Sequence, residues 1–187
     1  MKNKGILIGI GVVVLIVIIW ITTFNTLQSA DENVDSKWAQ VENQLKRRYD
    51  LIPNLVETVK GYTAYESSTL EAITAARSAC QSASNVSQLQ DANNQLTSSL
   101  EKLSVVVEDY PDLKANEQYQ SLMTELAGTE NRIAVARMDY NDAVQSLNKS
   151  IRTFPSSIIA GMSGIEKRDY FEITQVESEN PTVNFSK

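Results

Sequence analysis

Residues 5–21 read GILIGIGVVVLIVIIWI, an apolar run without a single charged side chain. At about 1.5 Å of rise per helical residue, Gly5 to Phe24 spans roughly 30 Å, the thickness of the hydrocarbon core of a bilayer. A segment in lipid must satisfy its own backbone hydrogen bonds, so the run is predicted to be a transmembrane helix. Trp20 lies where an interfacial aromatic anchor is expected. The rest of the chain is polar, which indicates one membrane helix and one attached domain.

A secretory signal peptide is the alternative interpretation of this run, with Lys2 and Lys4 as its basic start. The apolar core of a signal is typically ~7–15 residues long and ends at a small-residue cleavage site. This run is longer, and residues 22–27 contain no Ala-x-Ala pattern, so we expect a retained anchor. The two lysines precede the run and acidic residues follow it within 31–35, so the positive-inside rule predicts a cytoplasmic N-terminus and a domain outside.

Composition restricts the classes of function that are open to the domain. The chain has 187 residues, a formal net charge of -6, no histidine and a single cysteine, Cys80. Without histidine it lacks the usual general base, the commonest metal ligand and every Ser-His or Cys-His pair, so we predict no enzyme, no cofactor and no metal site. One cysteine excludes an internal disulfide, and the acidic balance argues against nucleic acid as a partner.

Apolar residues recur at alternating steps of four and three from residue 34 to residue 62. This repeat of about 3.5 residues is typical of helices that pack side by side. The phase continues past Pro53, which favours a kink over a break and a single helix running to about Cys80. The alternative is a new helix with Asp50 as its N-cap and Pro53 in its first turn.

Two further apolar stripes follow a polar loop at residues 81–85. One extends to Tyr110, and the other runs from about residue 115 to Ile151, where Phe154-Pro155 stops it. Eight residues of the three stripes are predicted to be core: Trp38, Leu45, Ile52, Val59, Leu96, Leu103, Ile133 and Leu147. We therefore predict an all-α fold in which the N-terminal transmembrane helix continues into a long-helix, up-and-down, coiled-coil-like bundle. Residues 1–24 would form the tail and anchor, 25–173 the bundle and 174–187 a flexible C-terminal tail.

The lengths of these predicted helices do not balance. The third helix would overshoot the top of the first unless it breaks near Gly128, which leaves its last apolar residues without a partner. Either residues 156–173 fold back over them or a neighbouring chain covers them. We expect a homo-oligomer, with self-association through Tyr140, Val144, Leu147 and Ile151. The spacing Gly5-x-x-x-Gly9 in the membrane helix is a weaker signal of the same kind.

Three arginines stand inside the apolar stripes, at Arg48, Arg77 and Arg137. Unpaired buried arginines are costly, so each is expected to have a carboxylate or carbonyl partner, and Glu130 is one candidate. The favoured interpretation is a structural polar layer of these four residues that fixes the register of the helices. The alternative is a binding site for phosphate or carboxylate. Cys80, with no histidine to activate it, is expected to be a small buried hydrophobe.

Several long motifs resemble the LemA family, and together they cover nearly the whole chain. They are QLKRRYDLIPNLV at 44–56, Glu71, Ala76-Arg77, GTENRIAVAR at 128–137, Tyr140-Asn141, Phe154-Pro155 and Tyr170-Phe171. The resemblance implies a bacterial membrane protein with a helical-bundle domain, in the cytoplasmic (inner) membrane. It implies no activity, because the family has no established one. Members are associated with proteostasis in the cell envelope, including a membrane zinc metalloprotease.

Two functional hypotheses follow. The first is a non-enzymatic, membrane-anchored helical scaffold that self-associates. The second is an adaptor or regulator of another membrane protein, such as a membrane protease, with the polar family motifs as its docking surface. An enzyme is the least favoured class, because the usual catalytic groups are missing.

Overall fold

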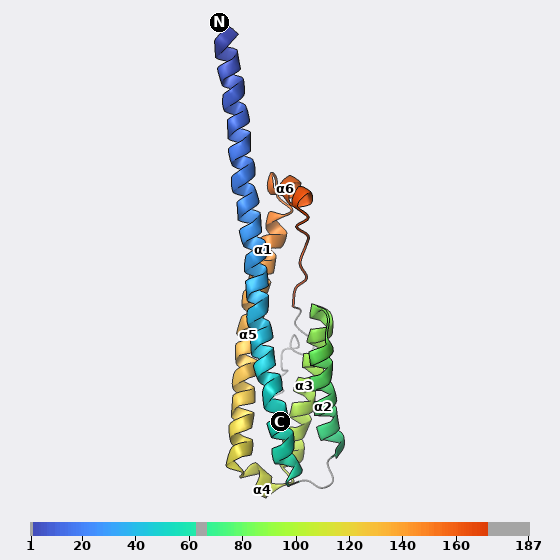
Figure 1. Ribbon diagram of the computed structural model, residues 1–187. Helices are drawn as coiled ribbons and strands as arrows, with labels where there is room; N and C mark the ends of the chain where they lie inside the picture. Colours follow the sequence, from blue (N-terminus) through green and yellow to red (C-terminus); the bar gives the residue numbers. More distant parts are fainter. Residues whose placement is uncertain (1, 63–66, 172–187) are drawn as a thin grey trace, which may run out of the picture. The chain divides into compact units, whose positions relative to one another are not determined.

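The computed structural model describes residues 2–62 and 67–171, and these form six helices and no strand (Figure 1). The helices are α1 (Lys2–Lys60), α2 (Ser67–Ser82), α3 (Val86–Val107), α4 (Pro111–Lys114), α5 (Glu117–Ser150) and α6 (Ser156–Ser163). The predicted all-α fold is confirmed. Two compact units divide the chain: unit 1 comprises Met1–Glu42 with Ala136–Asp169, and unit 2 comprises Asn43–Val135 with Tyr170–Lys187. The predicted tail at 174–187 lies outside the described residues.

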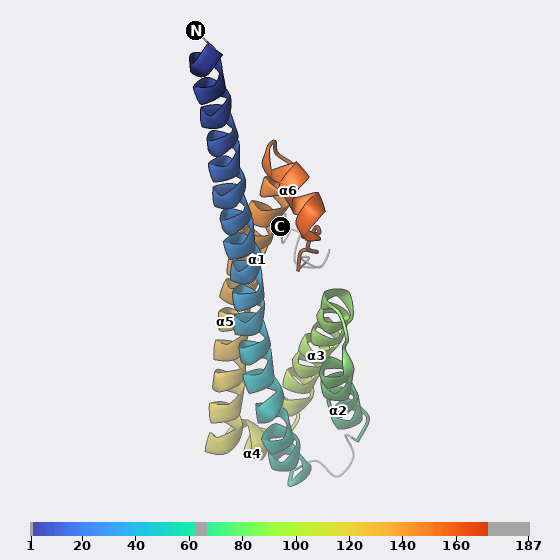
Figure 2. The same cartoon turned by 45° about the horizontal axis from the view of Figure 1, so that its top comes forward.

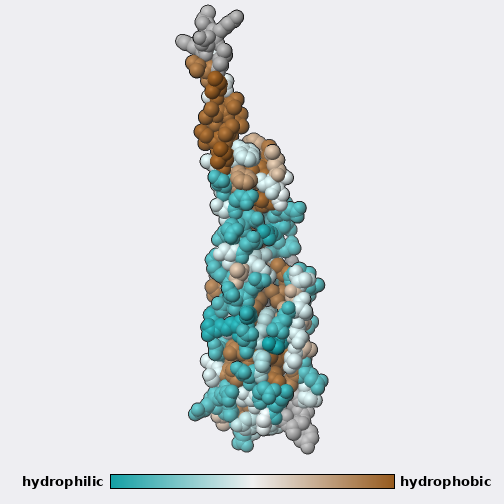
Figure 3. Space-filling view, viewed as in Figure 1, coloured by the Kyte–Doolittle hydropathy of each residue, from teal (hydrophilic) through white to brown (hydrophobic). Residues whose placement is uncertain are grey.

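The apolar run forms the N-terminal part of α1. Within the described residues, α1 is the one helix long and apolar enough to cross a membrane. Its most apolar stretch has a mean hydropathy of 2.8, and none of that stretch is buried inside the protein. Figure 3 shows this stretch as a continuous apolar surface. Near its end, the ring of Trp20 stacks on Phe24 at a centroid distance of 5.5 Å. These features fit a single-pass membrane protein.

In unit 1, α6 packs against the part of α1 that follows the apolar run (Figure 2). Ile159 and Ala160 of α6 form a buried cluster with Leu27 of α1. Helix α6 ends at Gly164, whose φ of 70° lies in the left-handed region that glycine adopts without steric cost. The cap turns the chain there, and the backbone N–H of Ile165 donates to the carbonyl of Ala160 at 3.1 Å.

In unit 2, α2 and α3 form an antiparallel hairpin that both ribbon views show side by side. The hairpin turns before Asn85, the N-cap of α3, whose side chain accepts a hydrogen bond from the backbone N–H of Gln88 at 2.9 Å. Short helix α4 begins at Pro111, a position where the missing N–H costs nothing. Of the eight predicted core residues, seven are buried: Leu45, Ile52, Val59, Leu96, Leu103, Ile133 and, in unit 1, Leu147. The eighth, Trp38, is half-buried and its ring contacts that of Tyr140.

The predicted first helix is wrong at its end but correct at Pro53. Helix α1 continues through Pro53, so Asp50 is not an N-cap. The helix stops at Lys60 rather than near Cys80, because Gly61 and Tyr62 form a turn closed by a bond from Tyr62 N–H to the Val59 carbonyl at 2.9 Å. Glycine costs about 1 kcal/mol in a helix interior, which makes this the weakest point of the run. The stripe that ends at Cys80 belongs to the separate helix α2.

Candidate functional site

The most buried charged group of the described soluble part is Arg48 of α1, which is 3% exposed. Its guanidinium donates to Asn93 Oδ1 at 3.0 Å and to Thr97 Oγ1 at 3.1 Å, both on α3, and pairs with the Glu130 carboxylate of α5. Burial lowers the pKa of the Arg48 guanidinium, and the charge of Glu130 opposes that shift. The network joins three helices of unit 2 through one side chain. Arg48 thus has the polar partners that the sequence predicts for it, Glu130 among them, and the register-fixing role of this layer stays a prediction.

Arg77 satisfies a backbone group that Pro53 leaves open. In an α-helix, the carbonyl of residue 49 accepts from the N–H of residue 53, and proline has no N–H to donate. In this structure Arg77 Nε of α2 donates to the Tyr49 carbonyl at 2.9 Å. The proline and the arginine of two separate sequence motifs therefore act as one structural device, which ties α2 to α1.

Beside Arg48, the Tyr49 hydroxyl lies next to the Cys80 thiol. Burial raises the pKa of Tyr49 and also raises the pKa of Cys80. Among the described residues, the hydroxyl has no hydrogen-bond partner of good geometry. Because the thiolate is the reactive form of cysteine, a raised pKa keeps Cys80 in its inert form at neutral pH. The expected role of Cys80 as a small buried side chain fits this environment.

The fourth predicted member of the polar layer, Arg137, belongs to the other unit. It is buried on the part of α5 that lies in unit 1. Two positions further along α5, Asp139 pairs with Lys37 of α1 at 2.9 Å. Arg48, Arg77 and Glu130 thus belong to unit 2, where Arg48 pairs with Glu130 and Arg77 bonds to the Tyr49 carbonyl, whereas Arg137 belongs to unit 1.

Two residues that bond to Arg48, Asn93 and Thr97, were not predicted from the sequence. Asn93 stands between Leu89 and Leu96 at steps of four and three, which is a polar residue at a core position of the α3 stripe. The rule that singles out the arginines applies to it equally. Thr97 has no comparable signal, because threonine one turn further along a helix is as common on a surface as beside a core.

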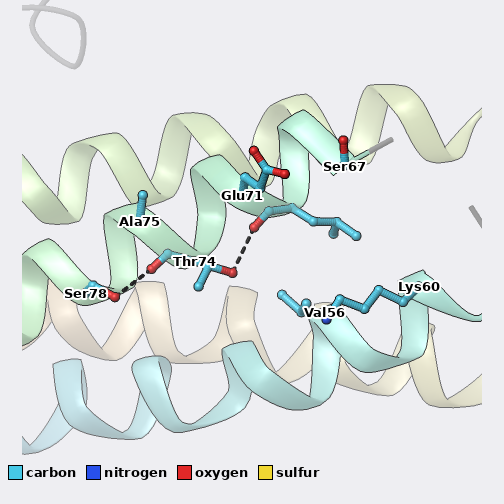
Figure 4. Close-up of a pocket in the computed structure, with 8 residues that line it drawn as sticks. Val56, Lys60, Ser67, Glu71, Thr74, Ala75 and Ser78 are labelled. Carbon is cyan, nitrogen blue, oxygen red and sulfur yellow. Dashed lines mark hydrogen bonds between the residues drawn. The ribbon is translucent and has the colours of Figure 1, made fainter. Parts of the chain in front are cut away.

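Unit 2 also contains an open groove of about 620 Å³ between α1 and α2 (Figure 4). Its residues are Val56 and Lys60 of α1 with Ser67, Leu70, Glu71, Thr74, Ala75 and Ser78 of α2. Figure 4 shows Val56 facing the side of α2 that carries Thr74 and Ser78. The hydroxyls of Thr74 and Ser78 donate to their own helix, to the carbonyls of Leu70 and Thr74. The sequence did not predict the groove, although Glu71 belongs to one of the motifs.

The far end of α5 is covered by the chain's own C-terminal segment, which is the first of the two alternatives that the sequence left open. Tyr140, Val144 and Leu147 are buried, and Ile151 packs against the α6 cluster. These four residues therefore do not form an exposed face for a second chain. The C-terminal part of α5 is covered because residues 156–169 fold back along it.

Backbone contacts hold this returning segment. The Asn148 side chain makes two hydrogen bonds with the backbone of Arg168, at 2.9 and 3.0 Å, and the Tyr140 hydroxyl donates to the Asp169 carbonyl at 2.9 Å. The Arg168 guanidinium reaches Asp31 of α1 at 2.9 Å. Burial alone would lower the pKa of Arg168, but the hydrogen bond and charge of Asp31, with Asp35, raise it.

These features define a class of protein: an all-α protein of long helices whose N-terminal helix is long and apolar enough to span a membrane. The LemA family model matches residues 37–185, and the chain belongs to the LemA family. It is 27% identical to Magnetosome protein MamQ 2 of Paramagnetospirillum magneticum, over 85% of this chain and 70% of that protein. It is 26% identical to Protein LemA of Metamycoplasma hominis, over 82% of this chain and 70% of that protein. Family and relatives fit a membrane-associated protein.

Proposed function

We propose that this chain is a non-enzymatic, membrane-anchored helical scaffold that binds a helical segment of another membrane protein in the groove between α1 and α2. The observation that supports this proposal is a difference between the Arg48 layer and the groove, which both lie in unit 2. In the Arg48 layer, the terminal nitrogens of the guanidinium on α1 bond to Asn93 and Thr97 of α3 and to Glu130 of α5. In the groove, apolar side chains line a space that the chain's own described side chains leave open.

The chemistry of the groove suits a helix better than a polar small molecule. Val56 and Leu70 supply apolar surface, and the hydroxyls of Thr74 and Ser78 are already bonded to their own helix. Lys60 and Glu71 add one charge of each sign to the lining. An amphipathic helix that inserts apolar residues at steps of three and four and presents mixed charges at its edges would match this arrangement.

A photo-crosslinking amino acid at Ser78 tests this proposal in native membranes. Ser121, an exposed serine of α5 that does not line the groove, is the matched control position. We expect an adduct from position 78 and none from position 121, with peptides of one integral membrane protein in that adduct. The adduct should disappear when Glu71→Lys reverses a charge of the groove. No adduct at 78, or equal adducts at both positions, would contradict a docking role for the groove.

Self-association is the second candidate, and it is favoured by the apolar part of α1. None of the apolar stretch of α1 is buried within the chain, and a Cβ added at Gly5, Gly9 or Gly11 would meet nothing within 4 Å. Gly5 and Gly9 lie on one helix face, where small residues let two helices approach closely, and parallel anchors in one bilayer are concentrated by their confinement. The measurement is the mass of particles extracted with their lipids. Gly9→Leu should reduce that mass to one chain, whereas Gly11→Leu, on another face, should leave an oligomer intact.

A further inference from the structure

The α6 segment exposes an apolar face that faces away from the bundle. Phe154, just before α6, and Ile158 and Met162 within it are large apolar side chains that are 83%, 58% and 73% exposed. Residues 153–165 carry no charge at all, while Arg152 precedes them and Glu166, Lys167 and Arg168 follow. A charge-free stretch with large exposed apolar side chains is unusual on the water-exposed surface of a small domain.

The opposite face of α6 fixes its height along α1. Ile159 and Ala160 pack on Leu27 and Phe24, which follow the apolar run within a few residues. The hydrocarbon core of roughly 30 Å extends from Gly5 to about Phe24, and Leu27 lies three positions past Phe24, or roughly 4.5 Å along a helix. The headgroup zone on each side of a bilayer is roughly 5–8 Å thick, from a core of about 30 Å and a whole bilayer of about 40–45 Å. Helix α6 therefore lies at the level of the headgroups whenever the apolar run spans the membrane.

We propose that α6 is an interfacial helix, with Phe154, Ile158 and Met162 inserted into the leaflet from which the domain emerges. This inference rests on the membrane-spanning role of α1 and adds a second membrane contact to it. Short helices that lie in the interface bury one apolar face at the boundary of headgroups and acyl chains. Arg152 and Lys167, which flank this charge-free stretch, are placed to meet lipid phosphates.

The position of α6 beside the span distinguishes lipid from a protein partner at this site. In the space-filling view, brown and tan atoms of α6 lie at the end of unit 1 that adjoins the brown span, with paler atoms between them (Figure 3). The same bilayer that covers the span thus covers α6 without any further molecule. A domain held at two points, by α1 and α6, is restricted in its tilt and in its rotation about the axis of α1.

The test measures the depth of a nitroxide label in the full-length protein, reconstituted in vesicles of phosphatidylcholine and phosphatidylglycerol. The labelled variants are Met162→Cys and Met138→Cys, each in a Cys80→Ser background. Met138 is an exposed methionine of the same unit, at 58%, and serves as the control. Val14→Cys reports on the span. Collision rates with apolar oxygen and with a water-soluble nickel chelate are compared at each position.

We expect the label at 162 to favour oxygen over the chelate several-fold relative to the label at 138, and to approach the behaviour of position 14. Ile158→Asp, which puts a charge into the proposed contact, should return position 162 to the values of 138. If 162 behaves like 138 while 14 is lipid-buried, this inference alone is overturned. Shielding of 162 from both probes would mean a protein covers α6 and would overturn it equally. Chelate access at position 14 would overturn the membrane-spanning role as well.

Discussion

Glu130→Ala is expected to destabilise the protein more than Arg48→Met, although both remove the same ion pair. The side chains differ in exposure, at 4% for Arg48 and 33% for Glu130. Loss of the carboxylate leaves a buried guanidinium with only the neutral acceptors of Asn93 and Thr97. Removing one partner of a buried pair in this way typically costs about 3–5 kcal/mol. Alanine is a good helix former, so the backbone of α5 adds no penalty of its own.

In Arg48→Met, the groups that lose their partner are the Glu130 carboxylate and the Asn93 side chain. The Glu130 carboxylate is exposed enough to be hydrated, so the main cost of Arg48→Met is the buried Asn93 side chain that loses its donor, about 1–3 kcal/mol. The double variant should cost less than the sum of the two single ones, because the guanidinium that Glu130→Ala strands is absent from it and only Asn93 still lacks its donor. The relevant measurement is the unfolding of the full-length protein in mild detergent, followed by far-ultraviolet circular dichroism.

In thermal unfolding, Glu130→Ala should lower Tm by about 6–20 °C, from about 2–4 °C per kcal/mol for a chain of this size. Glu125→Ala is the matched control, because Glu125 also lies on α5 and pairs with Arg47, but both of its partners are largely exposed. That pair should be worth under about 1 kcal/mol. If Arg48→Met proved costlier than Glu130→Ala by more than about 1 kcal/mol, the asymmetry argument from burial would be refuted.

Three further predictions test the core, the buried tyrosine and the orientation. Leu103→Ala should cost about 2–5 kcal/mol because Leu103 is fully buried, while Val105→Ala, 72% exposed, should cost under about 0.5 kcal/mol; equal losses in denaturant titrations would mean that the core is misassigned. Tyr49→Phe should be neutral or stabilising by up to about 1 kcal/mol, since it removes a buried hydroxyl without a partner. The raised pKa of Tyr49 means that the unfolded chain loses its proton first, so stability should fall as the pH rises above 10.0, and less so in the phenylalanine variant. Protease added to intact spheroplasts should digest the domain, and complete protection would place the domain in the cytoplasm instead.

The sequence was sufficient for the helices because their periodicity is a local property. Steps of three and four identify the buried faces of α1, α3 and α5, and the residues at those steps, such as Leu45 and Leu96, are buried. The ends of the helices were harder to predict from the sequence. The end of α1 at Lys60 depends on a competition between a continuing stripe and one weak helix former, Gly61, and the packing of α2 decides that competition.

The polar layer could be predicted only in part. An arginine inside an apolar stripe requires partners, so Arg48 and Glu130 could be found, and the same rule would have found Asn93. The link between Pro53 and Arg77 could not be found, because it depends on how α2 is placed beside α1. The groove has the same origin, since its volume is set by the distance between two helices and no single residue type encodes that distance.

The returning segment was misjudged for a related reason. Asn148 and Tyr140 hold the main chain of residues 168 and 169, and main-chain contacts leave no pattern in the side chains of the segment that is held. The side-chain pattern of residues 156–169 therefore does not indicate that this segment covers the end of α5.

The contact between Asp31 and Arg168 joins residues that are 137 positions apart, and this separation sets an order of assembly during synthesis. At roughly 5–20 residues per second, Arg168 is made about 7–27 s after Asp31. The Arg48 layer needs nothing beyond Glu130, so unit 2 has all the members of that layer while the segment that closes unit 1 is still missing. A chain cut short before Arg168 would retain the contacts of Arg48 and lose the ion pair between Asp31 and Arg168.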